Sequence, residues 1–116
     1  MSLANRARGG FGEDMVSRWY ERHGYRVIDR NWRDGRRGEI DIVASSPDGV
    51  IVFCEVKARA SAAFGHPFEA ITPTKVARIR RVAAAWLSAH PGAPSGVRLD
   101  AAAVLGVEIE VREGIG

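Results

Sequence analysis

The sequence predicts an α/β domain in which helices flank one β-sheet, with the elements in the order α, β, β, β, α, β, β. Two stretches repeat apolar residues at helical spacing, and five short runs are rich in β-branched and aromatic residues. The 116 residues suffice for one domain, and 46% apolar with 27% charged residues is typical of folded proteins. We expect a single domain over residues 10–116. Residues 1–9 are polar, basic and aperiodic, which indicates a flexible arm.

The first helix is expected from Phe11 to His23, where Gly24 supplies a stop signal. Its apolar residues fall on one helical stripe: Phe11, Met15, Val16, Trp19 and Tyr20. The glycines at positions 9, 10 and 12 fit a helix entry, and a phosphate-cradling loop is the weaker alternative.

Three strands are expected next, over Tyr25–Ile28, Glu39–Ala44 and Val50–Lys57. A loop around Asp34 and Gly35 separates the first two, and the turn SSPDG separates the second from the third. Short connections of this kind predict an antiparallel meander.

The second half of the chain begins with a structured loop over Arg59–Ile71. Thr72 followed by Pro73 has the chemistry of an N-cap and a first helical position, which predicts a second helix reaching about Ala89. Two further strands are expected, over Val97–Leu105 and Glu108–Val111.

Bulk features restrict the environment of the protein. No apolar run approaches the roughly 20 residues that cross a bilayer, and the opening MSLANRARGG has no apolar core of a signal peptide. We therefore expect a cytoplasmic protein with no membrane partner. The single cysteine, Cys54, cannot form an internal disulfide, and its apolar surroundings favour a buried thiol over a reactive one.

Arginine is clustered along the chain, although the net charge is only +3 and the pI about 9.6. The clusters are Arg6 and Arg8; Arg30, Arg33, Arg36 and Arg37; and Arg78, Arg80 and Arg81. Guanidinium groups bind phosphate oxygens in bidentate fashion, so the clusters fit a polyanionic partner. An ordinary solvated surface is the alternative.

Charged residues enter two strands in a way that indicates a site. Alternation places Ile51, Phe53, Glu55 and Lys57 on one face of the third strand and Val52, Cys54 and Val56 on the other. Both faces begin apolar, so this is a central strand whose cover ends near Glu55. In the second strand Glu39 and Asp41 share a face, while Ile40 and Ile42 point the opposite way.

If the second and third strands pair as a hairpin, Asp41 lies beside Glu55. Two adjacent carboxylates repel unless a cation lies between them, and oxygen ligands suit Mg²⁺ or Mn²⁺. Lys57 can then orient or deprotonate water, or offset charge on a phosphate. The alternative is a Lys57–carboxylate ion pair without catalysis. Glu13 also permits two interpretations, because an acid near a helix N-terminus is stabilised by the helix dipole alone.

Six segments in one order now carry a family resemblance: GGFGED, YRVIDRNWR, GEIDIV, VFCEVKAR, FGHPFEAITPTK and VRLDAAAV. They resemble the YraN-like family of uncharacterised proteins, which is similar to the Holliday-junction resolvases of the PD-(D/E)XK nuclease superfamily. The resemblance extends from about Gly9 to Val104. It implies a restriction-endonuclease-like core, a mixed sheet flanked by helices.

The resemblance also implies roles for individual residues. Asp41 corresponds to the motif aspartate, Glu55 and Lys57 to the E-x-K pair, and Glu13 to a helix glutamate that many members add to the metal site. Lys75 and Arg59 correspond to basic positions that can touch phosphate. Ile40 stands where the superfamily name has proline, as in many members.

The resulting expectation is a Mg²⁺- or Mn²⁺-dependent endonuclease that cleaves DNA, branched DNA included. Asp41, Glu55 and Lys57 would be catalytic, and Glu13, Asp41 and Glu55 would hold the metal. The residues expected to bind backbone phosphates are Arg36, Arg37, Arg59, Lys75, Arg78 and Arg81.

Other interpretations remain. A non-catalytic nucleic-acid-binding module with the same fold is the main alternative, and a protein-interaction domain with an acidic partner is a third. Trp32 can stack on a base or cap the core. Asp100 is expected to pair with a cation, and a homodimer is compatible with the sequence.

Overall fold

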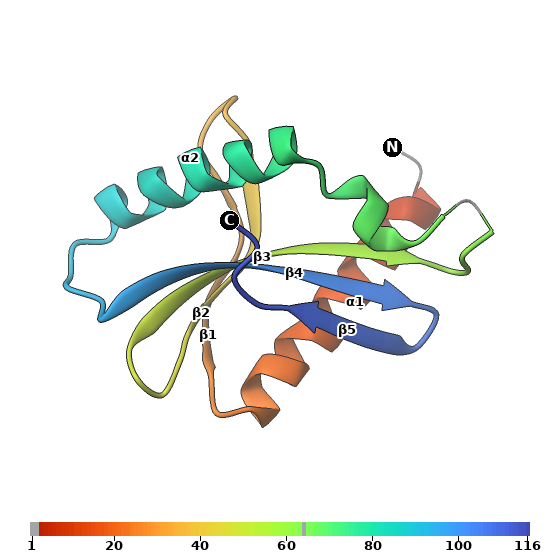
Figure 1. Cartoon of the computed structure of the whole chain (residues 1–116), viewed down its shortest axis with the longest axis horizontal. Coiled ribbons are helices and arrows are strands. Elements are labelled where there is room, and N and C mark those ends of the chain that lie inside the picture. Colours follow the sequence, from red (N-terminus) through yellow and green to blue (C-terminus); the bar gives the residue numbers. More distant parts are fainter. Residues whose placement is uncertain (1–2, 64) are drawn as a thin grey trace.

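A five-stranded sheet lies between two helices, one on each face (Figure 1). The computed structural model describes the backbone of residues 3–63 and 65–116, and the side chains of residues 10–63 and 65–116. The elements are α1 (Leu3–Arg22), β1 (Arg26–Arg33), β2 (Glu39–Ser45), β3 (Val50–Arg59), the 3₁₀ helix η1 (Pro67–Ala70), α2 (Pro73–Ala89), β4 (Gly96–Leu105) and β5 (Glu108–Arg112).

The sheet is mixed, and its strands lie in sequence order. Strands β1, β2 and β3 form an antiparallel meander, β4 is parallel to β3, and β5 returns antiparallel to β4. The parallel pair requires a crossover connection, which α2 provides. The predicted α/β class, element order and mixed sheet are confirmed, and η1 is an additional short element within the loop expected before α2.

The α1 face of the sheet has its own apolar core. Val16 and Tyr20 of α1 are fully buried against Val52, Cys54 and Val56, the side chains that alternation assigned to a common face of β3. Helix α1 approaches the sheet closely at Gly12, because a Cβ built there would lie 2.9 Å from the Cβ of Ala58. The glycines at positions 9, 10 and 12 therefore lie inside a helix rather than in a phosphate-binding loop.

The α2 face is covered by Ile79, Val82 and Trp86, which pack on Phe53 of β3 and Leu99 of β4. The helix begins as predicted: Thr72 has extended dihedral angles and its Oγ1 accepts the backbone N–H of Lys75 at 3.3 Å. Proline at the first helical position needs no N–H partner, which fixes the start further.

Two boundaries differ from the expectation. Helix α1 begins at Leu3, so residues 3–9 of the expected arm are helical, consistent with the high helix propensity of their Leu, Ala and Arg residues. The side chains of Arg6 and Arg8 lie outside the described part, and the flexibility of the arm stays a prediction. Phe11 was expected on the apolar stripe, but it is 51% exposed because it lies beyond the sheet contact at Gly12.

Strand β1 continues five residues beyond its expected end at Ile28. Pairing with β2 extends to Arg33, because inter-strand hydrogen bonds outweigh the low strand propensity of a polar segment. The strand is irregular: its register shifts between Val27 and Asp29, and Asn31 has a positive φ of 53°. Asparagine tolerates this conformation better than most residues.

The expected alternation in β2 is wrong at one position. Ile42 packs in the α1-face core, whereas Ile40 packs in the α2-face core with Val82. The two isoleucines therefore do not share a face. The β2–β3 ladder runs from Ser45–Ile51 to Ile42–Cys54, while β3 continues to Arg59 beside β4. Between Ile42 and Glu39 the strand is paired with β1 alone, and here its side chains depart from regular alternation.

Asp100 has no solvent exposure and forms the centre of a polar network in the α1-face core. Its carboxylate accepts the Tyr20 hydroxyl at 2.6 Å and the Arg98 guanidinium at 2.8 Å and 3.0 Å. The backbone N–H of Gly114 adds a fourth donor at 3.2 Å. The expected pairing of Asp100 with a cation is confirmed, and its described contacts are structural.

Neither helix is both long and apolar enough to span a bilayer over the part of the chain that the structure describes.

Candidate functional site

Charged side chains line a pocket where β2 and β3 pass under the first turns of α2. Its volume is about 360 Å³. The lining residues are Glu39, Asp41, Glu55, Lys57, Lys75, Arg78 and Ile79. Hereafter we call it the acidic pocket. It contains all three predicted catalytic residues and two of the six predicted phosphate-binding residues.

Asp41 is fixed to the neighbouring strand through its side chain. Its Oδ2 accepts the backbone N–H of Val56 at 2.8 Å, just beyond the last ladder pair, Ile42–Cys54. In a regular antiparallel pair a backbone carbonyl would accept the hydrogen bond of the Val56 N–H. Here the Asp41 carboxylate accepts it instead. The two strands separate without leaving this N–H unpaired.

The electrostatics of the pocket disfavour two ionised carboxylates. Burial, followed by the charge of Glu55, raises the pKa of Asp41 to about 8, and the hydrogen bond from Val56 opposes that rise. Glu13 and Glu39 raise the pKa of Asp41 further at longer range. Asp41 therefore keeps its proton at neutral pH, mainly because it is removed from water and secondly because Glu55 is close.

Two lysines lie at the rim of this pair. Lys57 Nζ is 3.5 Å from Glu55 Oε1, with 31% and 15% of the two side chains exposed. Burial, followed by its proximity to Lys57, lowers the pKa of Lys75. Lys75 lies in the first turn of α2, so the cap at Thr72 also determines where this second ammonium sits.

Glu13 lies next to the pocket but is engaged elsewhere. Its side chain is only 14% exposed, and its Oε1 is 3.6 Å from Nη2 of Arg30. Burial raises the pKa of Glu13, while hydrogen bonding to Asn31 and the charge of Arg30 oppose the rise. The helix-dipole explanation does not apply, because α1 starts ten residues earlier.

The acidic groups do not form a closed ligand set. Among residues 10–63 and 65–116, no three Asp, Glu, His or Cys side chains are near enough to one another to hold a metal ion. Asp41 and Glu55 share the pocket, and Glu13 is held toward Arg30 instead.

The remaining predicted phosphate-binding residues lie outside the acidic pocket. Arg36 and Arg37 occupy the turn between β1 and β2, where Arg37 contacts Asp34 at 3.5 Å. Arg59 ends β3 and is half-buried, and Arg81 is exposed on α2. The structure thus brings Lys75 and Arg78 to the acids and leaves these four apart.

Glu39 is a pocket residue that the sequence analysis did not assign to the site. It is half-buried, lines the pocket and pairs with Arg33 at 3.0 Å. Strand alternation already placed Glu39 on the same face as Asp41, and this was the signal that could have identified it. Ile79 supplies the apolar wall and was predicted only as a core residue.

Two residues with open interpretations have packing roles. Trp32 is partly buried against the α2-face core, with its ring 6.1 Å from that of His90, which agrees with a core cap. Cys54 is 1% exposed, and burial raises the pKa of its thiol, so it behaves as a small apolar residue.

The fold and the pocket define an α/β protein that presents an acid–lysine cluster between two inner strands of a mixed sheet and the first turns of a helix. The chain belongs to the uncharacterised protein family UPF0102, whose family model matches residues 12–104. This membership confirms the YraN-like resemblance.

Several UPF0102 proteins are similar to this chain over most of its length. A UPF0102 protein of Streptomyces coelicolor is 50% identical over 103 residues, covering 88% of this chain and 78% of its own. Another, from Beutenbergia cavernae, is 45% identical and aligns with 97% of this chain and 98% of its own. A third, from Leifsonia xyli subsp. xyli, is 50% identical over 84% of this chain and 80% of its own. These relatives therefore share nearly the whole domain.

Proposed function

We propose that the protein is a divalent-metal-dependent endonuclease that hydrolyses phosphodiester bonds in nucleic acid, with DNA as its expected substrate. The observation that carries the proposal is the partly buried Asp41–Glu55 pair with Lys57 and Lys75 in one open pocket. Phosphodiester hydrolysis needs an electrophile for the phosphate, an activated water and cationic groups that offset developing charge. The acidic pocket has residues suited to each requirement.

The residues present fit Mg²⁺ or Mn²⁺. The pKa of Asp41 is raised because the side chain is removed from water and lies close to Glu55, and a dication between the two acids would favour ionised Asp41. Both ions prefer oxygen ligands and commonly take only one or two carboxylates beside water and substrate oxygens. Asp41 and Glu55 would hold the ion, and Glu13 would join them on release from Arg30.

Each side chain then has a definable task. Held by Asp41 and Glu55, a divalent ion would supply polarisation of the phosphate and a lowered pKa of the attacking water. Lys57, beside Glu55, orients that water or offsets charge on the phosphate. Lys75 and Arg78 contact the phosphate from the first turns of α2, and Arg36, Arg37, Arg59 and Arg81 bind the backbone further away.

The topology supports this proposal by analogy. An antiparallel pair carrying Asp41 on one strand and Glu55 and Lys57 on the next, followed by a parallel strand, fits a restriction-endonuclease-like core. Fold alone does not determine activity, so the proposal depends on the pocket chemistry.

A second candidate, a non-catalytic nucleic-acid-binding module, has one observation in its favour. The Lys57–Glu55 contact at 3.5 Å neutralises one acid without a metal. In this alternative the basic residues still bind phosphates, while Lys57 never meets a reacting group.

A cleavage assay tests the catalytic proposal. The protein is incubated with branched, single-stranded and duplex DNA in Mg²⁺ or Mn²⁺. Wild type should cleave at least one substrate, and Asp41→Asn, Glu55→Gln and Lys57→Met should each lower the rate by about 10²-fold or more. Asp48→Asn, an exposed acid in the β2–β3 turn, is the matched control. Cleavage that Asp41→Asn leaves unchanged contradicts the assignment.

Calorimetry separates the two candidates. Binding of Mn²⁺ that is lost in Asp41→Asn supports the enzyme. Salt-dependent DNA binding without any binding of Mg²⁺ or Mn²⁺ supports the module.

A further inference from the structure

A second pocket lies on the other side of the first turns of α2. Its volume is about 470 Å³, within the range of about 300–1,000 Å³ that small-molecule sites occupy. The lining residues are Phe68, Ile71, Pro73, Val76, Ala77, Arg80, Ala101, Arg112, Ile115 and Gly116. We call it the apolar pocket.

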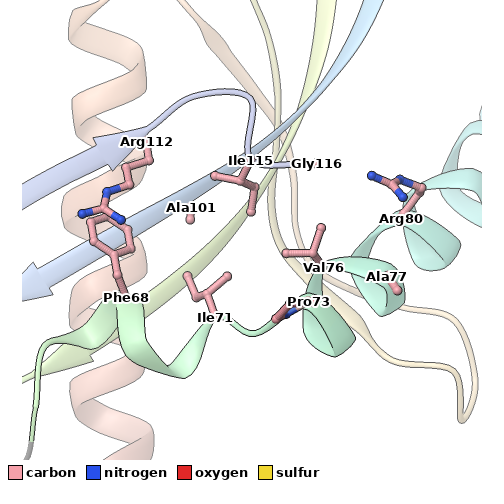
Figure 2. A pocket seen from close by; sticks show the side chains of 10 residues that line it. All are labelled: Phe68, Ile71, Pro73, Val76, Ala77, Arg80, Ala101, Arg112, Ile115 and Gly116. Carbon is pink, nitrogen blue, oxygen red and sulfur yellow. The ribbon is translucent and has the colours of Figure 1, made fainter.

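The apolar pocket has an aliphatic centre between two cations. In Figure 2 the side chains of Ile71, Val76 and Ile115 converge, while Arg112 and Arg80 lie at opposite ends. An occupant that matches this lining has an apolar face and carries negative charge at its periphery.

One of the two cations is stacked on an aromatic ring. The guanidinium carbon of Arg112 is 3.9 Å from the centroid of the Phe68 ring, which is itself stacked with His66 at 5.2 Å. Arg112 Nε also contacts Glu110 at 3.4 Å. A guanidinium fixed on an aromatic ring offers a planar surface on which another flat group can stack.

The two pockets are neighbours. Ala101 of the apolar pocket pairs in register with Glu55 of the acidic pocket, and strands so paired are about 4.8 Å apart. In α2, Lys75 and Arg78 line the acidic pocket, whereas Val76 and Ala77 between them line the apolar one. The pockets are therefore separated by about the 10 Å width of one helix.

We propose that the apolar pocket receives an unpaired nucleobase of the strand whose phosphate lies at the Asp41–Glu55 pair. This inference rests on the proposed function and names its substrate class: nucleic acid with a single-stranded or extrudable nucleotide. The base stacks on the Arg112 plane against Val76 and Ile115, and Arg80 meets its phosphate.

A base that is still stacked and paired inside a duplex cannot enter the pocket. Bases inside a duplex present only their edges, so entry requires unstacking and unpairing. This energy is smallest at nicks, junctions, mismatches and single strands, which are therefore the preferred substrates. Fully paired DNA should be bound through its phosphates alone.

Methyl NMR of the full chain tests the pocket with deoxyadenosine 5′-monophosphate as the probe. The probe should shift the methyl signals of Ile71, Val76 and Ile115, and deoxyribose 5-phosphate, which lacks the base, should not. Arg112→Ala should weaken the apparent affinity by about fivefold or more, since base stacking is lost. Arg18→Ala, which removes an exposed arginine on α1, should not weaken it.

Ala77→Trp, which fills the pocket, gives a second test. It should abolish the shifts, and Arg80→Ala keeps the test informative if the larger side chain prevents folding. Equal shifts with deoxyribose 5-phosphate would mean a phosphate site only and would overturn the inference. So would tighter binding of an apolar acidic dipeptide, acetyl-leucyl-glutamate, at the same methyls.

The outcomes separate this inference from the proposed function. If DNA is cleaved but the nucleotide shifts none of the three methyls, the base pocket is refuted and the nuclease stands. If the nucleotide binds in both wild type and Asp41→Asn while no DNA is cleaved, the base pocket stands and the nuclease is refuted. If both hold, wild type should cleave mismatched duplex faster than paired duplex, and Ala77→Trp should reduce that preference.

Discussion

Asp41 Oδ2 lies 2.8 Å from the backbone nitrogen of Val56 and accepts its hydrogen bond where the β2–β3 ladder ends. The contact attaches the acid of one strand directly to the residue that follows Glu55 on the next. The separation of the two acids is thereby set by backbone geometry. A carboxylate has further lone pairs for a ligand while this bond persists.

The first prediction concerns pH and stability. The pKa of Asp41 is raised to about 8 from the ordinary value of 3.8, so the folded protein keeps a proton there that the unfolded chain releases. Ionisation of Asp41 therefore reduces stability increasingly as pH rises from about 4 to 8. Asp41→Asn should raise the free energy of unfolding at pH 8 by on the order of 2 kcal/mol, discounted for the open pocket.

Urea titrations of both proteins at pH 5 and pH 8 measure this difference. The gain from Asp41→Asn should be larger at pH 8 than at pH 5, because the unfolded chain releases the Asp41 proton more favourably as pH rises while the folded protein keeps it until about pH 8. The difference in free energy of unfolding between Asp48→Asn and wild type should be the same at pH 5 and pH 8. A gain that is independent of pH would contradict the raised pKa.

The second prediction links cation binding to proton release. A cation binds ionised Asp41, so at pH 7 each bound Mn²⁺ should displace close to one proton, and apparent affinity should increase until the pH passes about 8. Calorimetry in two buffers with different ionisation enthalpies counts the protons. Binding with no proton release at pH 7 would place the ion away from Asp41.

The third prediction compares two glycines of α1. Gly10 has nothing within 4 Å of a built Cβ, so Gly10→Ala should stabilise the protein by about 0.5–1 kcal/mol through helix propensity. Gly12→Ala gains the same propensity but brings its Cβ to 2.9 Å from that of Ala58, and the strain should leave it destabilised by about 1–2 kcal/mol. Thermal unfolding measures both. If Gly12→Ala is as stable as Gly10→Ala, the close approach of α1 to β3 is wrong.

The fourth prediction addresses the Asp100 network. Asp100→Asn leaves Arg98 without its buried anion and should lower the free energy of unfolding by on the order of 3 kcal/mol. Glu110→Gln breaks an exposed pair with Arg112 and should change it by less than about 0.5 kcal/mol. Denaturant unfolding gives both values. Equal losses of stability in Asp100→Asn and Glu110→Gln would contradict a buried network centred on Asp100.

The fifth prediction concerns salt. DNA binding measured in EDTA should weaken linearly with the logarithm of salt concentration, because phosphate contacts release counterions. Lys75→Ala and Arg78→Ala should each make the slope shallower by about one unit, while Arg18→Ala leaves it unchanged. If neither Lys75→Ala nor Arg78→Ala changes the slope, the phosphate contacts lie elsewhere on the protein.

Local chemistry made part of this structure predictable. Helix α2 spans Pro73–Ala89 as expected, because the capping side chain of Thr72 and the fixed φ of Pro73 act within the helix itself. Glu55 and Lys57 follow from strand alternation, which also depends only on neighbouring residues. The extent of β1 was not accessible in this way, because β2 supplies its hydrogen bonds.

The missing parts of the site have the same explanation. Ile40 leaves its expected face where β2 separates from β3, next to the Asp41 contact with a residue 15 positions away. The partners of Asp100 include Tyr20, 80 positions away. Glu13 meets Arg30 only once α1 lies against the sheet. Contacts between distant segments have no periodic signal in one sequence.

Both edges of the sheet are poor templates for another strand. Strand β1 combines the register shift near Ile28 with the positive φ of Asn31, and β5 has only five residues, with Glu108, Glu110 and Arg112 exposed. Irregular or short, charged edges resist edge-to-edge aggregation. A homodimer of this protein would accordingly join through side-chain surfaces rather than a continuous sheet, and concentrated solutions should resist fibril growth.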